Sequence, residues 1–586
     1  MSLAKSNRPS IETLDALAAR VASGSRMSIG GHHFARLPIA LLTRVIDHGV
    51  RDLGYFAWAG GLPLELLLEA NAVAAIDICF SSLDIFGLAP RFRDCAENRR
   101  LPVNDWPALA MIQGLRAAQQ NLPFMPVQLP EGSTMVERCP AIEFHRDIRT
   151  GRVVGLVEAQ VLDTVLLHAP RADTAGNVEI YGARALDLAI VGAARQVLVT
   201  VDQIVPAGTL RNNGRQTIIT RNLVTAIAEV PGGAYPTSCL PHYATDFRRI
   251  REILDGTHGT LRQALELPAG GPPELLVKAA GVEPEAVIPG PFLGGAAPPA
   301  QPTVDELMAV RIARMLDNEG FASAGAVSPL GNVAFRLAKA THAPDLFIGT
   351  FSCGHVDVAP GTMTLSLLEA MDVGSAVSHN GGDDTYSTYY QPGIVTHEII
   401  GAAQIDAHGR TNNLELTKPS GGKLRLPGQG GMSDVANMHQ NYVVYVPRHS
   451  RAALVESVEV VSSARGIISA AEREMVGYRP GYTVLVTNLC VFRYDEAAGQ
   501  LVVVETMPGV TRETIVAETA LKVIFAADCP EMAPPTAEEL RVLREVIDPL
   551  GMRRLEFVSA RERGALLDEI LERDRRGTAK IVGMES

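Results

Sequence analysis

Two stretches, RDLGYFAWAGG at residues 51–61 and PDLFIGTFSCG at residues 344–354, decide the fold of this chain. They align without gaps at an offset of 293, so that Leu53 matches Leu346. Each is a short apolar run that ends at a glycine, which is typical of a buried strand followed by a turn. The repeat predicts two related units in tandem.

A second pair of stretches, HAPRADTAGN (168–177) and GAAQIDAHGR (401–410), repeats in the same order. Apolar runs alternate with helical patterns such as 38–47 and 332–340, which predicts an α/β fold with a largely parallel sheet in each half. The predicted strands are 26–29, 53–58, 74–79, 153–157, 164–167, 186–191 and 196–201 in the first half, and 322–324, 346–351, 399–405, 442–446 and 484–487 in the second.

The composition is that of a soluble globular enzyme. Of 586 residues 47% are hydrophobic and 20% charged, which excludes extensive disorder. The formal net charge of −12, without a long Lys/Arg run, argues against nucleic acid or an anionic membrane as the main partner. No apolar stretch reaches the ~18–20 uncharged residues of a membrane helix, and the N-terminus lacks the apolar core of a signal peptide.

The seven cysteines are scattered and include no CxxC pair. This spacing argues against a disulfide framework and a structural zinc site, so we expect no metal. Reduced thiols indicate a cytoplasmic location.

A Pro- and Gly-rich stretch at 267–302 divides the chain, because such a sequence continues neither helices nor central strands. We therefore predict domains at 1–266 and 303–586 joined by this linker. Two similar open sheets would place a site in the cleft between them.

The first candidate anion site is SIGGHH (28–33), where a strand meets a glycine pair before a helix. Gly30 and Gly31 permit positive φ and a close approach of backbone N–H groups to an oxygen, and His32 adds a donor or a base. The alternative is a tight turn that glycine merely permits.

Two further turns in the second half match this pattern. AGAVSP (324–329), with Gly325 and Ser328, is the counterpart of the first turn, and LPGQGG (426–431) precedes a helix. The functional interpretation of the latter is a second backbone cradle, formed by Gly428, Gln429, Gly430 and Gly431. The alternative is that Ser433 or Asp434 caps the following helix.

Reactive side chains follow the strand at 346–351. Ser352, Cys353 and His355 lie where sites of parallel sheets occur, and a thiol there is a candidate nucleophile or acid/base group. The alternative for Cys353 is a small packed side chain. Asp105, beside Trp106, is either a base with a raised pKa or a cap of the helix that follows.

Taken together, the motifs resemble the family I CoA-transferases, specifically the glutaconate CoA-transferase branch, with its α and β subunits fused in one chain. The α-type motifs are SIGGHH (28–33), LPFMP (122–126) and GNVEIYG (176–182), and the β-type motifs are AKATHAPDL (338–346), IIGAAQIDAHGRTNN (399–413) and KLRLPGQGGMSDVA (423–436). The resemblance implies a three-layer α/β/α domain in each half, an active site at their interface and a homo-oligomer. It implies acyl-CoA and a small carboxylic acid as substrates, with no cofactor besides the coenzyme A thioester that is itself substrate.

In this family a glutamate at the end of the APDL strand attacks the thioester and carries CoA to a second carboxylate. The resemblance assigns the thioester oxyanion to backbone donors at Gly30 and Gly31, and part of the CoA cradle to the LPGQGG turn. At the glutamate position this chain reads Phe351-Ser352-Cys353, without a carboxylate.

This departure leaves a second interpretation open. Related branches decarboxylate a CoA thioester with a cysteine near that position, which Cys353 resembles, or hydrolyse a C–C bond with an α-half carboxylate, whose place Asp105 occupies. A CoA-thioester sensor without catalysis is a third interpretation, and it requires both side chains to lie away from the cleft.

Overall fold

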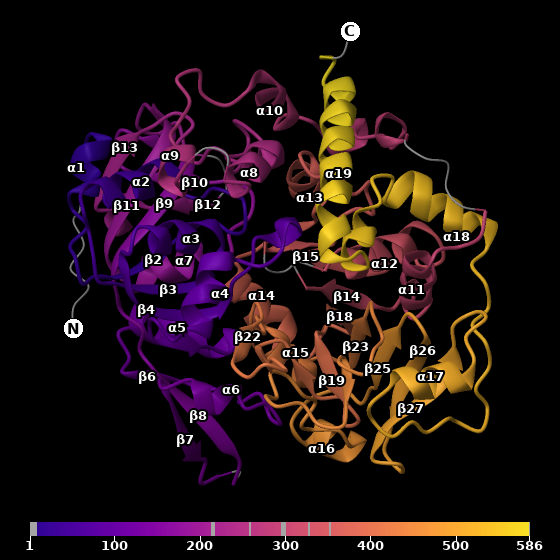
Figure 1. Ribbon diagram of the computed structural model, residues 1–586. Coiled ribbons are helices and arrows are strands. Elements are labelled where there is room, and N and C mark those ends of the chain that lie inside the picture. The colour runs from indigo at the N-terminus through magenta and orange to yellow at the C-terminus, as the bar shows by residue number, and fades with distance from the viewer. Residues whose placement is uncertain are drawn as a thin grey trace.

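The two halves of the chain form two α/β units that lie side by side (Figure 1). This computed structural model describes residues 9–149, 151–211, 217–256, 259–294, 300–325, 328–350 and 353–584. The predicted α/β fold with tandem units is confirmed.

The first unit is built on a sheet with strand order β1-β13-β11-β9-β2-β3-β4-β5, and β10 and β12 pair antiparallel beside β9. The eight strands of the main path pair in parallel. Its strands are β1 (Ser10–Ile11), β2 (Arg26–Ile29), β3 (Leu53–Ala59), β4 (Val73–Phe80), β5 (Val103–Asp105), β9 (Leu162–Asp173), β10 (Val178–Ile180), β11 (Ala194–Val205), β12 (Thr217–Ile219) and β13 (Ala226–Glu229).

The second unit has the strand order β17-β16-β15-β14-β18-β23-β25-β26-β27, with a parallel centre from β15 to β25. Its strands are β14 (Phe321–Ala324), β15 (Phe347–Thr350), β16 (His355–Val356), β17 (Ser378–His379), β18 (His397–Gly401), β23 (Asn441–Val446), β25 (Thr483–Thr487), β26 (Cys490–Asp495) and β27 (Gln500–Thr506).

The internal repeat is visible in this topology. The run β3-β2-β9-β11-β13 of the first sheet corresponds to β15-β14-β18-β23-β25 of the second. The stretch at 51–61 supplies β3 and the stretch at 344–354 supplies β15, so the sequence match and the strand positions agree.

Helices cover both sheets. In the first unit they are α1 (Leu14–Ala18), α2 (Ile39–Asp47), α3 (Gly61–Glu69), α4 (Pro90–Glu97), α5 (Ala108–Gln119), α6 (Met135–Arg138), α7 (Asp187–Ala193), α8 (Phe247–Leu254) and α9 (Leu261–Ala264). From residue 267 on they are α10 (Glu274–Ala279), α11 (Val304–Ala313), α12 (Pro329–Ala340), α13 (Leu368–Ser375), α14 (Gly382–Thr385), α15 (Met432–Met438), α16 (Ala470–Met475), α17 (Arg512–Glu518), α18 (Ala537–Arg541) and α19 (Ala560–Ile581).

Three small sheets complete the fold: β6-β8-β7, β20-β19-β24 and β21-β22. Their strands are β6 (Phe124–Val127), β7 (Ile142–Arg146), β8 (Val153–Glu158), β19 (Gln404–Asp406), β20 (Thr411–Asn412), β21 (Glu415–Thr417), β22 (Lys423–Arg425) and β24 (Leu454–Val455).

The strand predicted at 186–191 is wrong, because these residues begin helix α7 (Asp187–Ala193). The segment is apolar on nearly every side and packs against α5 and β9. A short, fully buried apolar run carries no periodicity that separates a helix from a strand.

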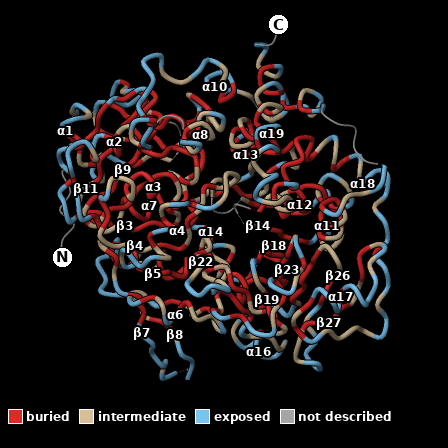
Figure 2. The backbone as a smooth tube through the Cα atoms, viewed as in Figure 1, coloured by how far each residue is buried: buried red, intermediate tan, exposed pale blue. Residues whose placement is uncertain are grey.

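Most strands and the helix faces against them are buried (Figure 2). No helix among the described residues is long and apolar enough to cross a membrane.

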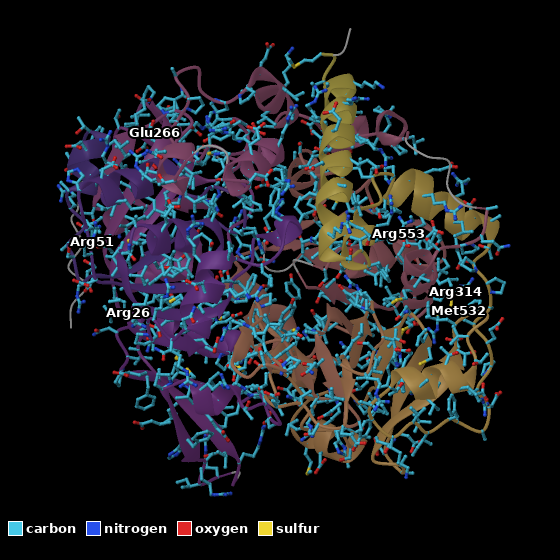
Figure 3. All side chains as sticks on the ribbon, in the orientation of Figure 1. Arg26, Arg51, Glu266, Arg314, Met532 and Arg553 are labelled. Carbon is cyan, nitrogen blue, oxygen red and sulfur yellow. The ribbon has the colours of Figure 1, made fainter. Side chains whose placement is uncertain are left out.

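The C-terminal segment packs back onto the second unit. Arg553, labelled in Figure 3, is buried and pairs with Asp548 at 2.9 Å, with Asp305 at 2.8 Å and with Glu306 at 3.1 Å. Because Asp305 and Glu306 lie on α11, these pairs hold the 3₁₀ turn η7 (Met552–Glu556) in place.

Candidate functional site

A cleft of about 740 Å³ lies between the two units, and we call it the inter-half cleft. The first unit contributes His32, Trp58 and Phe80, and the second contributes most of the wall. The residues of the second unit are Ala324, Gly325, Ser328, Tyr386, Tyr390, Glu398, Ile400 to Ala403, Asn413, Leu426 to Met432, Val435, Tyr445, Pro447, Arg448 and Glu556.

A second cavity of about 260 Å³, the inner cavity, also takes residues from both units. Three residues line both spaces: His32, Ala324 and Glu556. Because the two spaces share these side chains, we call the place where they meet the junction.

The LPGQGG turn (426–431) lines the cleft, as the sequence predicts for a ligand cradle. It also docks on the end of β4, since Gly430 N–H donates to the Cys79 carbonyl at 3.2 Å and Ser81 N–H donates to the Pro427 carbonyl at 2.7 Å. Gly428 has φ +111°, and a Cβ there would lie 2.7 Å from the Cys79 carbonyl oxygen. The glycines therefore permit contact between the units.

Gln429 and Asp434 tie the same turn to the first unit. The Gln429 amide donates to the Trp106 carbonyl at 2.9 Å, and Asp434 accepts from Leu109 N–H at 3.0 Å. Asp434 thus caps helix α5 of the other unit rather than its own helix. Its burial raises the pKa of the carboxyl to about 7.

The glycine pair at 30–31 does not act as the sequence predicts. Gly30 N–H donates to the Leu166 carbonyl at 2.9 Å, and Gly31 N–H donates to Asp187 Oδ1 at 2.8 Å. Both donors that the resemblance assigns to an oxyanion are used inside the protein. Glycine is needed because a Cβ at Gly30 would clash with the Leu167 side chain and one at Gly31 with the Ala35 carbonyl oxygen.

The His32 side chain, by contrast, lines the cleft, the inner cavity and a small cavity of about 40 Å³ beside the glycine pair. Burial, with lesser effects from His33 and Arg36, holds its pKa well below the usual range. His32 therefore presents a neutral imidazole at the junction.

The turn after β14 places Gly325 and Ser328 on the cleft wall. Ser328 N–H donates to the Gly325 carbonyl at 3.0 Å, and Pro329 then begins α12. The N-terminus of this helix therefore faces the junction.

Cys353 and His355 line the inner cavity, and Ser352, with Phe351, lies outside the described residues. His355 is buried, with Nδ1 at 3.1 Å from Nδ1 of His379. Burial, with smaller effects of His379 and Arg184, lowers its pKa to about 3, so this imidazole is neutral. Cys353 stays a candidate.

Asp105 is placed elsewhere. It is buried and holds Arg425 through two hydrogen bonds, one of them 3.0 Å long. It is absent from the described residues that line the three cavities above. Its position is that of an ion pair between the units.

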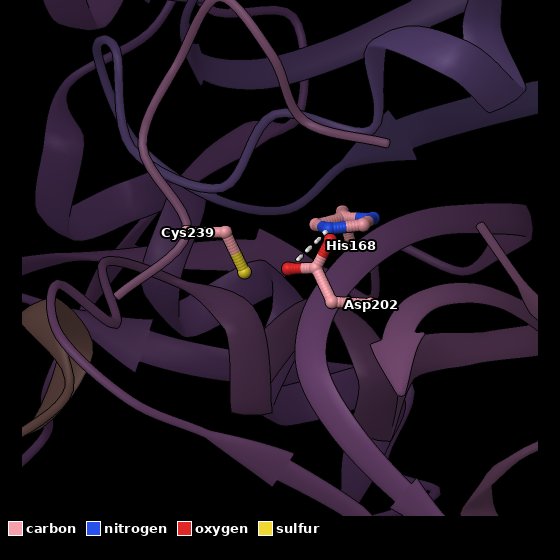
Figure 4. Close-up of side chains that lie close together, drawn as sticks. All are labelled: His168, Asp202 and Cys239. Carbon is pink, nitrogen blue, oxygen red and sulfur yellow. Dashed lines mark ion pairs between the residues drawn. The ribbon is translucent and has the colours of Figure 1, made fainter. Parts of the chain in front are cut away.

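Figure 4 shows a further cluster, formed by His168, Asp202 and Cys239. All three are buried, and His168 Nε2 lies 3.4 Å from Asp202 Oδ2. Asp202 also accepts from Gly232 N–H at 2.6 Å. The cluster joins the loop after β13 to the central strands β9 and β11, away from the cleft lining.

Sequence reasoning missed Glu556, which comes from η7 and reaches the junction. Its neighbourhood, MRRLEF, has no motif, and the contacts that place it lie more than 100 residues away in the chain. A polar residue in a half-apolar segment was the one available signal.

The model of the coenzyme A transferase family matches residues 11–227 and 307–518. The chain belongs to this family. It is an enzyme of the transferase class, and the resemblance seen in the sequence is confirmed.

The first of two glutaconate CoA-transferase subunits, the A chain of the Acidaminococcus fermentans enzyme, is 27% identical over 249 residues, which cover 40% of this chain and 78% of that protein. The IpdA subunit of a cholesterol ring-cleaving hydrolase from Mycobacterium tuberculosis is 28% identical over 244 residues, 40% of this chain and 83% of that protein. The acyl-CoA transferase YdiF of Escherichia coli O157:H7, solved as a thioester complex with CoA, has a TM-score of 0.65 at 14% identity and covers 90% of this chain and 96% of that chain. This last likeness confirms the tandem fold.

Proposed function

We propose that this enzyme transfers coenzyme A from an acyl-CoA to a small carboxylic acid at the junction between its two units. The observation that carries the proposal is the pair of connected spaces in a member of the CoA-transferase family, one of about 740 Å³ and one of about 260 Å³. The larger is open and takes the CoA arm, and the smaller takes the acyl group. No cofactor besides the CoA thioester enters this scheme.

Charge supports this orientation of the substrate. Arg448 is exposed on the wall of the inter-half cleft, where it can meet a phosphate of CoA. The inner cavity contains Arg336 and Arg563, but both guanidinium groups are engaged. Arg336 binds Asp372 at 2.7 and 2.9 Å, and Arg563 donates to the Ile85 carbonyl at 2.9 Å.

The inner cavity is mainly apolar otherwise. Its hydrophobic residues are Phe34, Ile85, Phe247, Met363, Leu365, Leu368 and Met552. An apolar wall whose arginines are already paired favours a hydrophobic acyl group over one with a second carboxylate. We therefore propose a medium-chain or aromatic acyl-CoA as donor.

Decarboxylation or C–C hydrolysis of a CoA thioester is the alternative, and it is favoured by Cys353 on the wall of the inner cavity. The test uses octanoyl-CoA or benzoyl-CoA with acetate and follows acetyl-CoA by mass spectrometry. Acetyl-CoA formed in proportion to the acid released supports transfer. Loss of acyl-CoA without acetyl-CoA contradicts it and supports the alternative, which Cys353→Ala then tests.

Assembly and location stay predictions. A homo-oligomer follows from the family resemblance alone, and a cytoplasmic location follows from the scattered cysteines.

A further inference from the structure

Glu556 lies in the C-terminal segment, beyond residue 518 where the family match ends. In Figure 1 this segment is yellow and lies against α12 and α13. The buried Arg553 anchors η7 through its three acidic partners, so the turn that carries Glu556 is fixed in position.

The Glu556 carboxylate is itself held by two elements of the second unit. Its Oε2 accepts from Leu330 N–H at 2.7 Å, in the first turn of α12, and its Oε1 accepts from the Tyr445 hydroxyl at 2.7 Å, near the end of β23. The positive end of the α12 dipole favours the ionised form. Each oxygen keeps a further lone pair, so the carboxylate can still react.

The other carboxylates on the two walls have different positions. Glu398 lines the cleft, and Asp84, Glu369 and Asp372 line the inner cavity. Among the described lining residues, Glu556 is the carboxylate that lines both spaces. A thioester whose CoA arm lies in one space and whose acyl group lies in the other has its carbonyl carbon at this junction.

Resting on the proposed function, we infer that Glu556 is the nucleophile of CoA transfer. Its Oε attacks the thioester carbonyl, the C–S bond breaks, and CoA leaves as the thiolate with an acyl-glutamyl anhydride behind it. The thiolate then attacks the glutamyl carbonyl, which releases the first acid as a carboxylate and leaves a glutamyl-CoA thioester. The acceptor carboxylate reverses both steps and regenerates Glu556.

The electrostatics of the junction agree with this role. Burial raises the pKa of Glu556 to about 7, against the opposing effects of Leu330 N–H, the Tyr445 hydroxyl and Arg563. A more basic carboxylate is a stronger nucleophile than an exposed one and is still largely ionised just above neutrality. The neutral His32 imidazole at the same junction adds no charge that would hold the carboxylate in an ion pair.

The decisive experiment traps the intermediate on the wild-type enzyme. The protein is incubated with octanoyl-CoA or benzoyl-CoA, whichever supports transfer to acetate, and then reduced with borohydride, which converts a glutamyl thioester to an alcohol. Peptide mapping is expected to place this change at Glu556. A change at Cys353, Glu398 or any other residue overturns the inference while the proposed function stands.

Variants give a second measurement. Glu556→Gln is expected to lower the transfer rate about 10³-fold or more, with CoA binding retained. Glu569→Gln, which changes an exposed glutamate of α19, is the matched control and is expected to keep wild-type activity. Transfer by Glu556→Gln within tenfold of wild type overturns the inference. Absence of transfer in the wild type overturns the proposed function as well.

Discussion

At the scale of single residues, Asp105 separates a catalytic role from a structural one. Its carboxylate is buried against the Arg425 guanidinium, so Asp105→Asn would leave a buried cation without its charge partner. We expect the free energy of unfolding to fall by about 3–5 kcal/mol, measured by urea denaturation. Asp94→Asn, at an exposed ion pair, is the control and is expected to change it by less than about 0.5 kcal/mol. Unchanged stability with lost activity would instead support catalysis by Asp105.

The pH dependence of transfer is a second test at this scale. Only the ionised Glu556 attacks, so kcat/KM is expected to rise about tenfold per pH unit below pH 7 and to level off above it. Asp434 is the matched control, because its pKa is also raised to about 7 but it caps α5 outside the cleft lining. Asp434→Asn is expected to keep the midpoint. A profile that falls with rising pH would contradict the assignment.

What the sequence predicts at residue scale follows from where the partners lie. Gly30 and Gly31 were found because a strand end and two glycines stand together, and that pattern is local. Their hydrogen-bond partners, Leu166 and Asp187, come from segments more than 130 residues away. A sequence pattern therefore predicts the turn but not whether its N–H groups stay open to a ligand.

At the scale of elements, the LPGQGG turn depends on a glycine at its point of closest contact. Gly428 lies on β4 of the other unit, whereas Gly421 has φ +80° and a Cβ added there would meet no heavy atom within 4 Å. We expect Gly421→Ala to cost about 1 kcal/mol from backbone strain alone. Gly428→Ala is expected to cost more and to raise the KM for acyl-CoA.

The readouts are thermal unfolding and steady-state kinetics of both variants. Equal effects would contradict the contact seen between Gly428 and Cys79, because both glycines have positive φ and differ mainly in their surroundings.

Strands were largely predictable, since aliphatic runs ending at glycine or polar residues carry their own boundaries. The run at 26–29 matches β2 residue for residue. Val153–Glu158 is a strand as predicted, but it belongs to a small sheet rather than to the main one. Sheet membership depends on pairing partners, which a local pattern does not contain.

At the scale of the whole molecule, the site is complete only when both units and the C-terminal segment are in contact. The first unit supplies His32, the second supplies the LPGQGG turn, and η7 supplies Glu556. The repeat in the sequence indicated two units, and their joint cleft followed from that symmetry. The third contributor has no counterpart in the repeat, so no comparison of the halves could identify it.

The chain cut between residues 266 and 267 tests this shared site. Residues 267–586 keep Phe292, which is buried against Gly577 of α19, with the segment it packs on. Each fragment alone is expected to give no acetyl-CoA from octanoyl-CoA or benzoyl-CoA and acetate, since neither contains the whole junction. Co-expressed fragments are expected to associate through Gln429 with the Trp106 carbonyl and through Asp434 with Leu109, and to regain transfer. Gel filtration reports the association, and transfer by either fragment alone would contradict a site built from both units.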